Sequence, residues 1–159
     1  GNGHDLAGSE AFWKMIENGE LTDPVSGKTI RPHNIRLMVN IDQIGCTLSP
    51  LESGRKDYMI MLGNNSLKPS ERELLSYCNR SSGLHFDLDF TYYGSKNFTE
   101  VFYRLSDQKV FIDNKIPAVL FTSGITMNTN RTRDTAETLD YEIFKKRIYL
   151  IFDWLEKML

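Results

Sequence analysis

The stretch SDQKVFIDNKIPAVLFTSGITMNTNRTRDTAETLD, residues 106–140, decides the fold. Its centre, residues 116–121, is a short apolar run with β-branched members that ends on Thr-Ser-Gly, which predicts a buried strand. The polar connection that follows, residues 123–140, is long for a link between two elements. Since long loops at the ends of buried strands often carry functional residues, we expect a site in this connection.

A second strand is predicted at residues 35–44, where aliphatic residues alternate with other types. This alternation places Asp42 at the carboxyl end of the strand, facing away from the aliphatic row. The remaining segments are predicted from their periodicity and turn residues: strands at 58–62 and 84–90, helices at 9–18, 70–79 and 141–159, and helical turns at 98–103 and 107–114. The strand at 84–90 has one polar face and is expected at an edge of the sheet.

Three residues are predicted to cap the helices: Ser9, Ser70 with Glu73 in a capping box, and Asp140. Strands that alternate with helices predict a three-layer α/β/α domain with a mostly parallel, mixed sheet. In such a sheet, ligands bind beyond the carboxyl ends of the strands. The loops that begin at Asp42 and at Ser123 meet that condition.

The composition describes one soluble, folded domain over residues 1–159. Hydrophobic residues make up 40% of the chain and charged residues 25%, and the net charge is −2. Lysine and arginine are scattered, so we expect no nucleic-acid partner, and no apolar run approaches the roughly 20 residues of a membrane span. Cys46 and Cys78 form no CxxC pair and are interpreted as two buried thiols, with a disulfide left open. The histidines at 4, 33 and 85 lack the spacing of a zinc motif.

The residues alone leave the chemistry open. Asp42 is either a metal ligand or general base, or an ordinary loop or cap residue. Asp107 follows Ser106 at a predicted helix start and is interpreted first as an N-cap, whereas Asp87 and Asp89 are interpreted as a solvated strand face. The sequence contains no glycine-rich phosphate loop and no GxSxG nucleophile elbow.

Five motifs, in order, resemble the C-terminal half of the zinc aminopeptidase family that includes the glutaminyl cyclases. They are Leu6 with Gly8-Ser9, the segment NIDQIG at 40–45, Ser106-Asp107-Gln108 with Phe111, Ile116-Pro117 with Phe121, and Asp134-Thr135 with Leu139-Asp140. The resemblance implies a phosphorylase/hydrolase-like zinc exopeptidase fold that is truncated at its N-terminus. It also implies zinc as the family's cofactor, a peptide as the substrate, and a secreted or periplasmic location.

The family's metal ligands are kept only at Asp42. The position of the family's Glu-Glu pair falls on Asn2 and Gly3, beside His4, and the position of its late histidine falls on Asn130. An amide oxygen is a poor zinc ligand, and one aspartate does not hold zinc. We therefore expect no zinc in this chain.

The side chains expected around Asp42, on the substrate side or behind the ligands, are Ser106, Asp107, Asn130 and Asp134. The resemblance then predicts a peptidase-like domain that has lost catalysis and acts in binding or assembly. The alternative is a fragment of an active zinc aminopeptidase, which hydrolyses N-terminal peptide bonds. A half-domain of this fold leaves one sheet edge unpaired, so self-association through that edge is also expected.

Overall fold

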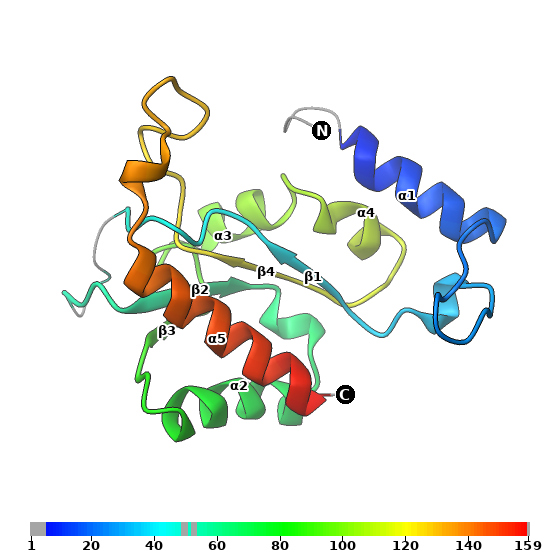
Figure 1. The fold of residues 1–159 in the computed structure, drawn as a ribbon, viewed down its shortest axis with the longest axis horizontal. Coiled ribbons are helices and arrows are strands. Elements are labelled where there is room, and N and C mark those ends of the chain that lie inside the picture. The colour runs from blue at the N-terminus through cyan, green and yellow to red at the C-terminus, as the bar shows by residue number, and fades with distance from the viewer. Residues whose placement is uncertain (1–5, 49–50, 52–53, 159) are drawn as a thin grey trace.

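A four-stranded mixed sheet lies at the centre of the computed structural model, which describes residues 6–48, 51 and 54–158 (Figure 1). The strands are β1 (Met38–Ile41), β2 (Tyr58–Leu62), β3 (Asp87–Asp89) and β4 (Ala118–Thr122). Their spatial order is β1-β4-β2-β3. β1 is parallel to β4 and β2 is parallel to β3, whereas β2 and β4 are antiparallel. The carboxyl ends of β1 and β4 therefore share one end of the sheet.

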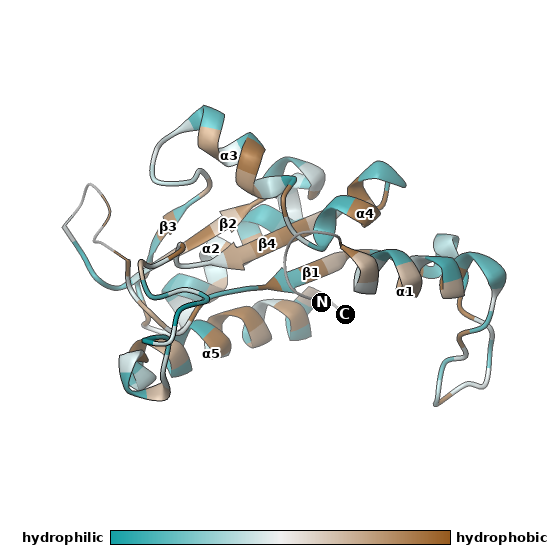
Figure 2. Ribbon diagram, turned by 90° about the horizontal axis from the view of Figure 1, so that it is seen from above, coloured by the Kyte–Doolittle hydropathy of each residue, from teal (hydrophilic) through white to brown (hydrophobic). Residues whose placement is uncertain are grey.

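Helices cover both faces of this sheet and confirm the predicted three layers. α2 (Pro69–Ser81) and α5 (Tyr141–Met158) pack on one face. α3 (Lys96–Tyr103) and α4 (Gln108–Asp113) lie on the other, and α1 (Ala7–Asn18) packs against α4. Figure 2 shows α5 on the opposite side of the strands from α3 and α4. Among the described residues, no helix is both long and apolar enough to cross a membrane.

The two inner strands, β2 and β4, form the core as their apolar sequences predict. Every residue of both strands is buried. Since side chains alternate between faces, Met59, Met61, Val119 and Phe121 pack toward α2 and α5. Tyr58, Ile60, Leu62 and Leu120 pack toward the opposite layer. The strand predicted from residues 116–121 is therefore central, and the strand predicted at 84–90 is at an edge, as expected.

Both edge strands are shorter than the sequence predicts. β1 ends at Ile41 because Gln43 adopts a left-handed φ of 55°, which a strand cannot continue through. β3 begins only at Asp87 because His85 has a φ of 50°. In β3 the hydrophobic alternation extends past His85 to Leu84, but backbone conformation, which alternation does not encode, stops the ladder.

The predicted caps are right at one helix and wrong at two. Ile143 N donates to Asp140 Oδ1 at 3.2 Å, which confirms the cap of α5. At α2 the capping residue is Lys68, whose N donates to Glu71 Oε2 at 2.9 Å, because Pro69 fixes the first turn earlier than expected. Ser9 lies inside α1, where its hydroxyl donates to the carbonyl of Leu6.

Arg147 is fully buried, although its place on the helical wheel predicts that it lies off the apolar face of α5. Its guanidinium donates to the carbonyl oxygens of Ile44, Cys46 and Tyr58 at 2.7, 2.8 and 3.1 Å. It also lies over the ring of Tyr58, at 5.1 Å from the centroid. Burial lowers the pKa of Arg147. These contacts replace the lost hydration of the cation and fix the segment that follows Asp42.

Both cysteines are free thiols. Cys78 is fully buried, as interpreted from the sequence, and burial raises the pKa of its thiol to about 11. Cys46 is only half-buried, and its Sγ donates to the carbonyl of Thr138 at 3.3 Å.

Candidate functional site

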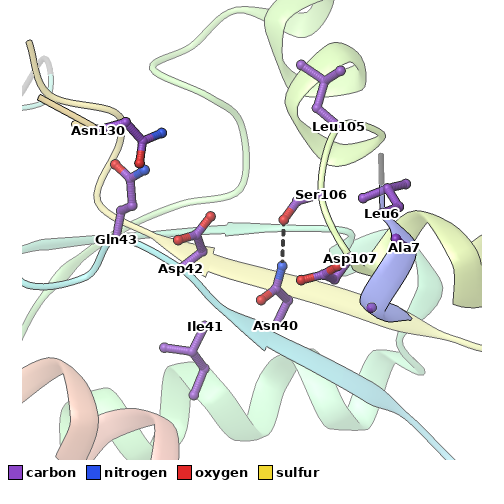
Figure 3. Close-up of a pocket in the computed structure, with 11 residues that line it drawn as sticks. Leu6, Ala7, Asn40, Ile41, Asp42, Gln43, Leu105, Ser106, Asp107 and Asn130 are labelled. Carbon is purple, nitrogen blue, oxygen red and sulfur yellow. Dashed lines mark hydrogen bonds between the residues drawn. The ribbon is translucent and has the colours of Figure 1, made fainter. Parts of the chain in front are cut away.

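Two hollows meet at the carboxyl ends of β1 and β4, and Figure 3 shows the residues that line the first. Asp42, Gln43 and Asn130 line both of them. The first has a volume of about 340 Å³ and extends to Ser106 and Asp107. The second has a volume of about 260 Å³ and extends to Asp134. The structure thus brings together all five side chains that the sequence nominates; their roles stay predictions.

Asp42 stands between the two hollows because the ladder of β1 continues for one more bond. Its backbone N donates to the carbonyl of Phe121 at 3.0 Å. Figure 3 shows its carboxyl group between Ser106 and Asp107 on one side and Gln43 and Asn130 on the other. The neighbouring Ile41 points to the opposite face of the sheet, as strand alternation requires.

The wall formed by Ser106 and Asp107 is fixed by amide side chains. Asn40 Nδ2 donates to Ser106 Oγ at 3.0 Å and to Gln108 Oε1 at 2.8 Å. Gln108 is fully buried, and its Nε2 donates to the carbonyl of Tyr103 at 2.7 Å. Asp107 is the N-cap residue of α4, as interpreted from the sequence, but its carboxylate makes no cap hydrogen bond to the helix. Asp107 is exposed and lines the hollow instead.

The opposite wall is the long loop after β4, tied to the segment after β1. Ser123 Oγ donates to the carbonyl of Gln43 at 2.6 Å and also to the carbonyl of Cys46. Thr129 Oγ1 donates to Gln43 Oε1 at 3.0 Å. Within the loop, Asn130 N donates to Asp134 Oδ2 at 3.2 Å. The two loops therefore hold one another in place.

Gln43 and Asn130 both have left-handed backbones, with φ values of 55° and 59°. Asparagine tolerates this region, but glutamine rarely adopts it, and such a residue costs roughly 1–3 kcal/mol. The hydrogen bonds from Ser123 and Thr129 to Gln43 offset that cost. Strained residues of this kind cluster at functional sites, which agrees with the position of Gln43 between the two hollows.

The carboxyl group of Asp42 favours its protonated form more than a free aspartate does. Partial withdrawal from water in the concave surface is the first cause that raises its pKa, and the negative charge of Asp107 is the second. The residue remains accessible to solvent. Two carboxylates beside neutral amides and a hydroxyl can hold a protonated amine or a polar ligand.

The donor set does not fit a catalytic zinc ion. Zinc takes three protein ligands of the histidine, cysteine or carboxylate type, with an open position for water. Here the groups beside Asp42 and Asp107 are the amides of Asn40, Gln43 and Asn130 and the hydroxyl of Ser106. Among residues 6–48, 51 and 54–158, no three histidine, cysteine, aspartate or glutamate side chains come together to hold a metal ion. Asn2, Gly3 and His4 lie outside the described residues.

Three residues that shape the site were not singled out from the sequence. Asn40 carries a weak signal, because it lies two residues before Asp42 and therefore on the same face of the predicted strand. The sequence gives no such signal for Gln43, because hydrophobic periodicity does not encode its left-handed φ. Gln108 belongs to a recognised motif, but its burial and its bond to Asn40 depend on a contact 68 residues away in sequence.

Solved structures that resemble this chain include two aminopeptidases. The Legionella pneumophila LapA aminopeptidase matches with a TM-score of 0.61 and 14% identity, over 94% of this chain and 35% of that one. BSAP, a zinc aminopeptidase from Bacillus subtilis, matches in two structures with TM-scores of 0.64 and 0.62 and identities of 14% and 13%. Each match covers 96% of this chain and 32% of BSAP.

The likeness shows the fold, which is the one expected from the five sequence motifs. This chain spans about a third of the length of these enzymes. At the level of sequence, no family model and no curated protein matches.

Proposed function

We propose that this chain is a zinc-exopeptidase-like domain that has lost metal binding and catalysis and acts in binding or assembly. The observation that carries the proposal is the donor set around Asp42, where amides and a hydroxyl stand beside two carboxylates. The fold shared with LapA and BSAP supports the peptidase-like architecture. A secreted or periplasmic location belongs to the proposal and rests on the sequence motifs.

The proposed loss of metal binding does not require that the fold around Asp42 is disrupted. Asp42 is held by the ladder to β4, and both loops around it are tied by hydrogen bonds. The hollows are therefore well-formed surfaces that can hold a polar ligand. Within the part of the chain that the structure describes, they are not lined by three histidine, cysteine, aspartate or glutamate side chains placed to hold a metal ion that could activate a water molecule.

Metal analysis together with an activity assay tests the proposal. The purified chain is dialysed against zinc, washed and measured by inductively coupled plasma mass spectrometry. It is then assayed with amino-acid p-nitroanilides, and Asp42→Asn serves as the matched variant. We expect less than about 0.1 zinc per chain, the same in both proteins, and no release of nitroaniline.

One zinc per chain that disappears in Asp42→Asn, with activity on a p-nitroanilide, would overturn the proposal. That result would support the alternative, a fragment that keeps the chemistry of an active zinc aminopeptidase.

A further inference from the structure

The turn that follows β3, residues 91–95, is anchored on α3. Tyr92 N donates to Thr99 Oγ1 at 2.8 Å, and the ring of Tyr92 stacks on that of Phe102 with 3.9 Å between the centroids. Tyr93 has a left-handed backbone with a φ of 50°. A bulky residue rarely adopts this conformation, and such strain persists only where the surrounding structure fixes it. The turn is therefore held in one conformation by its neighbours.

The two tyrosines of this turn contact the first three residues of the loop after β4. Tyr93 Oη donates to the carbonyl of Ser123 at 2.9 Å, and Ile125 N donates to Tyr92 Oη at 3.1 Å. Between them, Gly124 has a φ of 97°, and a Cβ at this position would lie 3.0 Å from the ring of Tyr93. Glycine thus serves both the backbone conformation and the close approach of the ring. The turn fixes the point at which the loop leaves the sheet.

A second phenol joins this contact to the segment after β1. Tyr58 on β2 is fully buried, and its hydroxyl oxygen lies 2.6 Å from that of Tyr93. Tyr58 Oη also donates to the carbonyl of Ser123 at 2.8 Å and accepts from Leu48 N at 3.2 Å. Each phenol has one proton to donate. The carbonyl of Ser123 therefore keeps one phenol donor when either hydroxyl is removed, and it loses both only when both are removed.

We propose that Tyr93 and Tyr58 are positioning residues of the candidate site. Ser123, whose carbonyl they hold, donates from its N and Oγ to the carbonyl of Gln43 at 3.1 and 2.6 Å. The residue that the phenols hold is thus the one that ties the two walls of the site together, and the loop that starts from it carries Asn130 into both hollows. This inference rests on the proposed function, because it names the groups that shape the surface for a ligand.

Tyr103 offers a matched control at the other end of β4. Its hydroxyl donates to the carbonyl of Ala118 at 2.6 Å, and its side chain is half-buried. Neither residue lines either hollow. Removing this hydroxyl takes away the same kind of hydrogen bond from the same strand, so it separates the positioning of the site from general stability.

Hydrogen exchange of the full chain, followed by NMR at the amides of Ser123 and Ile125, tests the inference. We expect Tyr93→Phe to speed exchange at both amides about fivefold and Tyr103→Phe to leave it within about twofold of the original. Thermal unfolding should shift by a similar amount in the two variants, because each loses one hydrogen bond at an end of β4.

The double variant Tyr58→Phe/Tyr93→Phe gives a second readout. Since one phenol replaces the other at the carbonyl they share, we expect exchange to rise about a hundredfold, more than the product of the two single effects. The side-chain amide signals of Gln43 and Asn130 should also shift in this variant and stay in place in Tyr103→Phe. Circular dichroism checks the folding of each variant. If the double variant unfolds, the comparison of Tyr93→Phe with Tyr103→Phe decides alone.

Unchanged exchange at Ser123 and Ile125 in Tyr93→Phe would overturn the inference, as would an equal change in Tyr103→Phe. So would a folded double variant in which the two single effects only multiply. These outcomes are separable from the metal test. One zinc per chain, with a loop that still depends on Tyr93, removes the proposed loss of metal but keeps the positioning role. A zinc-free chain whose loop is unchanged in Tyr93→Phe removes only the positioning role.

Discussion

The two edges of the sheet differ in how they meet water. β3 is three residues long and carries Asp87 and Asp89. Asp89 Oδ1 accepts hydrogen bonds from N and Oγ1 of Thr91 at 2.8 and 2.6 Å, so the chain turns away directly after the strand. β1 carries no charge and is followed directly in the chain by Asp42. α5 also has apolar side chains that are exposed. One edge therefore carries charges, which disfavour strand pairing, and the other does not.

The two edges also differ in what holds the chain beside them. Short strands, charges and tight turns are the usual protection against unwanted pairing, and β3 has all three. β1 is also short, at four residues, but it carries no charge, and the segment after it is fixed by Arg147 and Ser123. The uncharged strand is thus followed by a segment that hydrogen bonds from α5 and from the loop after β4 hold in place.

The largest expected effect comes from releasing the segment after β1. Arg147→Met removes the donors to the carbonyls of Ile44, Cys46 and Tyr58. We expect the free energy of unfolding to fall by about 3 kcal/mol, because buried acceptors lose their partners. Urea unfolding measures this change, and hydrogen exchange should rise at residues 43–47 before it rises at 87–89. A loss below about 1 kcal/mol would contradict the role given to Arg147.

The protected edge should respond more weakly. Asp89→Ala removes the acceptor for both bonds from Thr91, so we expect a loss of about 1 kcal/mol in urea unfolding. The same variant should increase self-association, because it removes a charge from the β3 edge. Asp89→Asn keeps an acceptor oxygen and serves as the control for stability. Equal losses in both variants would show that charge, and not the turn, is what Asp89 contributes.

A smaller effect is expected from Asp42, with a defined pH dependence. Since the folded protein raises the pKa of Asp42 above its usual 3.8, ionising this group costs more in the folded state than in the unfolded state. The penalty is absent below about pH 3.8 and develops fully as the pH rises through the folded pKa. Asp42→Asn should therefore raise the melting temperature at pH 7 by about 1–2 °C and leave it unchanged at pH 3. A lower melting temperature at pH 7 would contradict this sign.

The smallest effect concerns the pair of carboxylates. Asp107→Asn should lower the pKa of Asp42, because it removes the negative charge that is the second cause of the upward shift. Carbon-13 NMR of the side-chain carboxyl groups measures this pKa directly. The pKa should stay raised above its usual value in the variant, since burial, the first cause, remains. An unchanged pKa would mean that the two carboxylates do not interact.

Periodicity in the sequence predicts the central fold because that part is set by burial. The apolar runs of β2 and β4 and the stripe of α5 are local patterns, and they place the two inner strands and the last helix correctly. The spatial order of the strands and the reversed direction of β2 and β3 depend on long-range pairing, which no local pattern encodes.

The candidate site is less predictable for the same reason. Strand-end position identifies Asp42, and motif order identifies Ser106, Asp107, Asn130 and Asp134. The left-handed backbone of Gln43 and the burial of Arg147 both depend on contacts between segments far apart in the chain. Charged residues are almost never fully buried, so sequence reasoning places Arg147 at the surface.

Calorimetric titration of zinc into the chain at pH 7 tests the central claim most directly. The account predicts no saturable heat of binding at micromolar chain, and the same flat titration for Asp42→Asn, because amides and a hydroxyl stand beside the two carboxylates of the site. A one-to-one isotherm with a submicromolar dissociation constant that disappears in Asp42→Asn would contradict it.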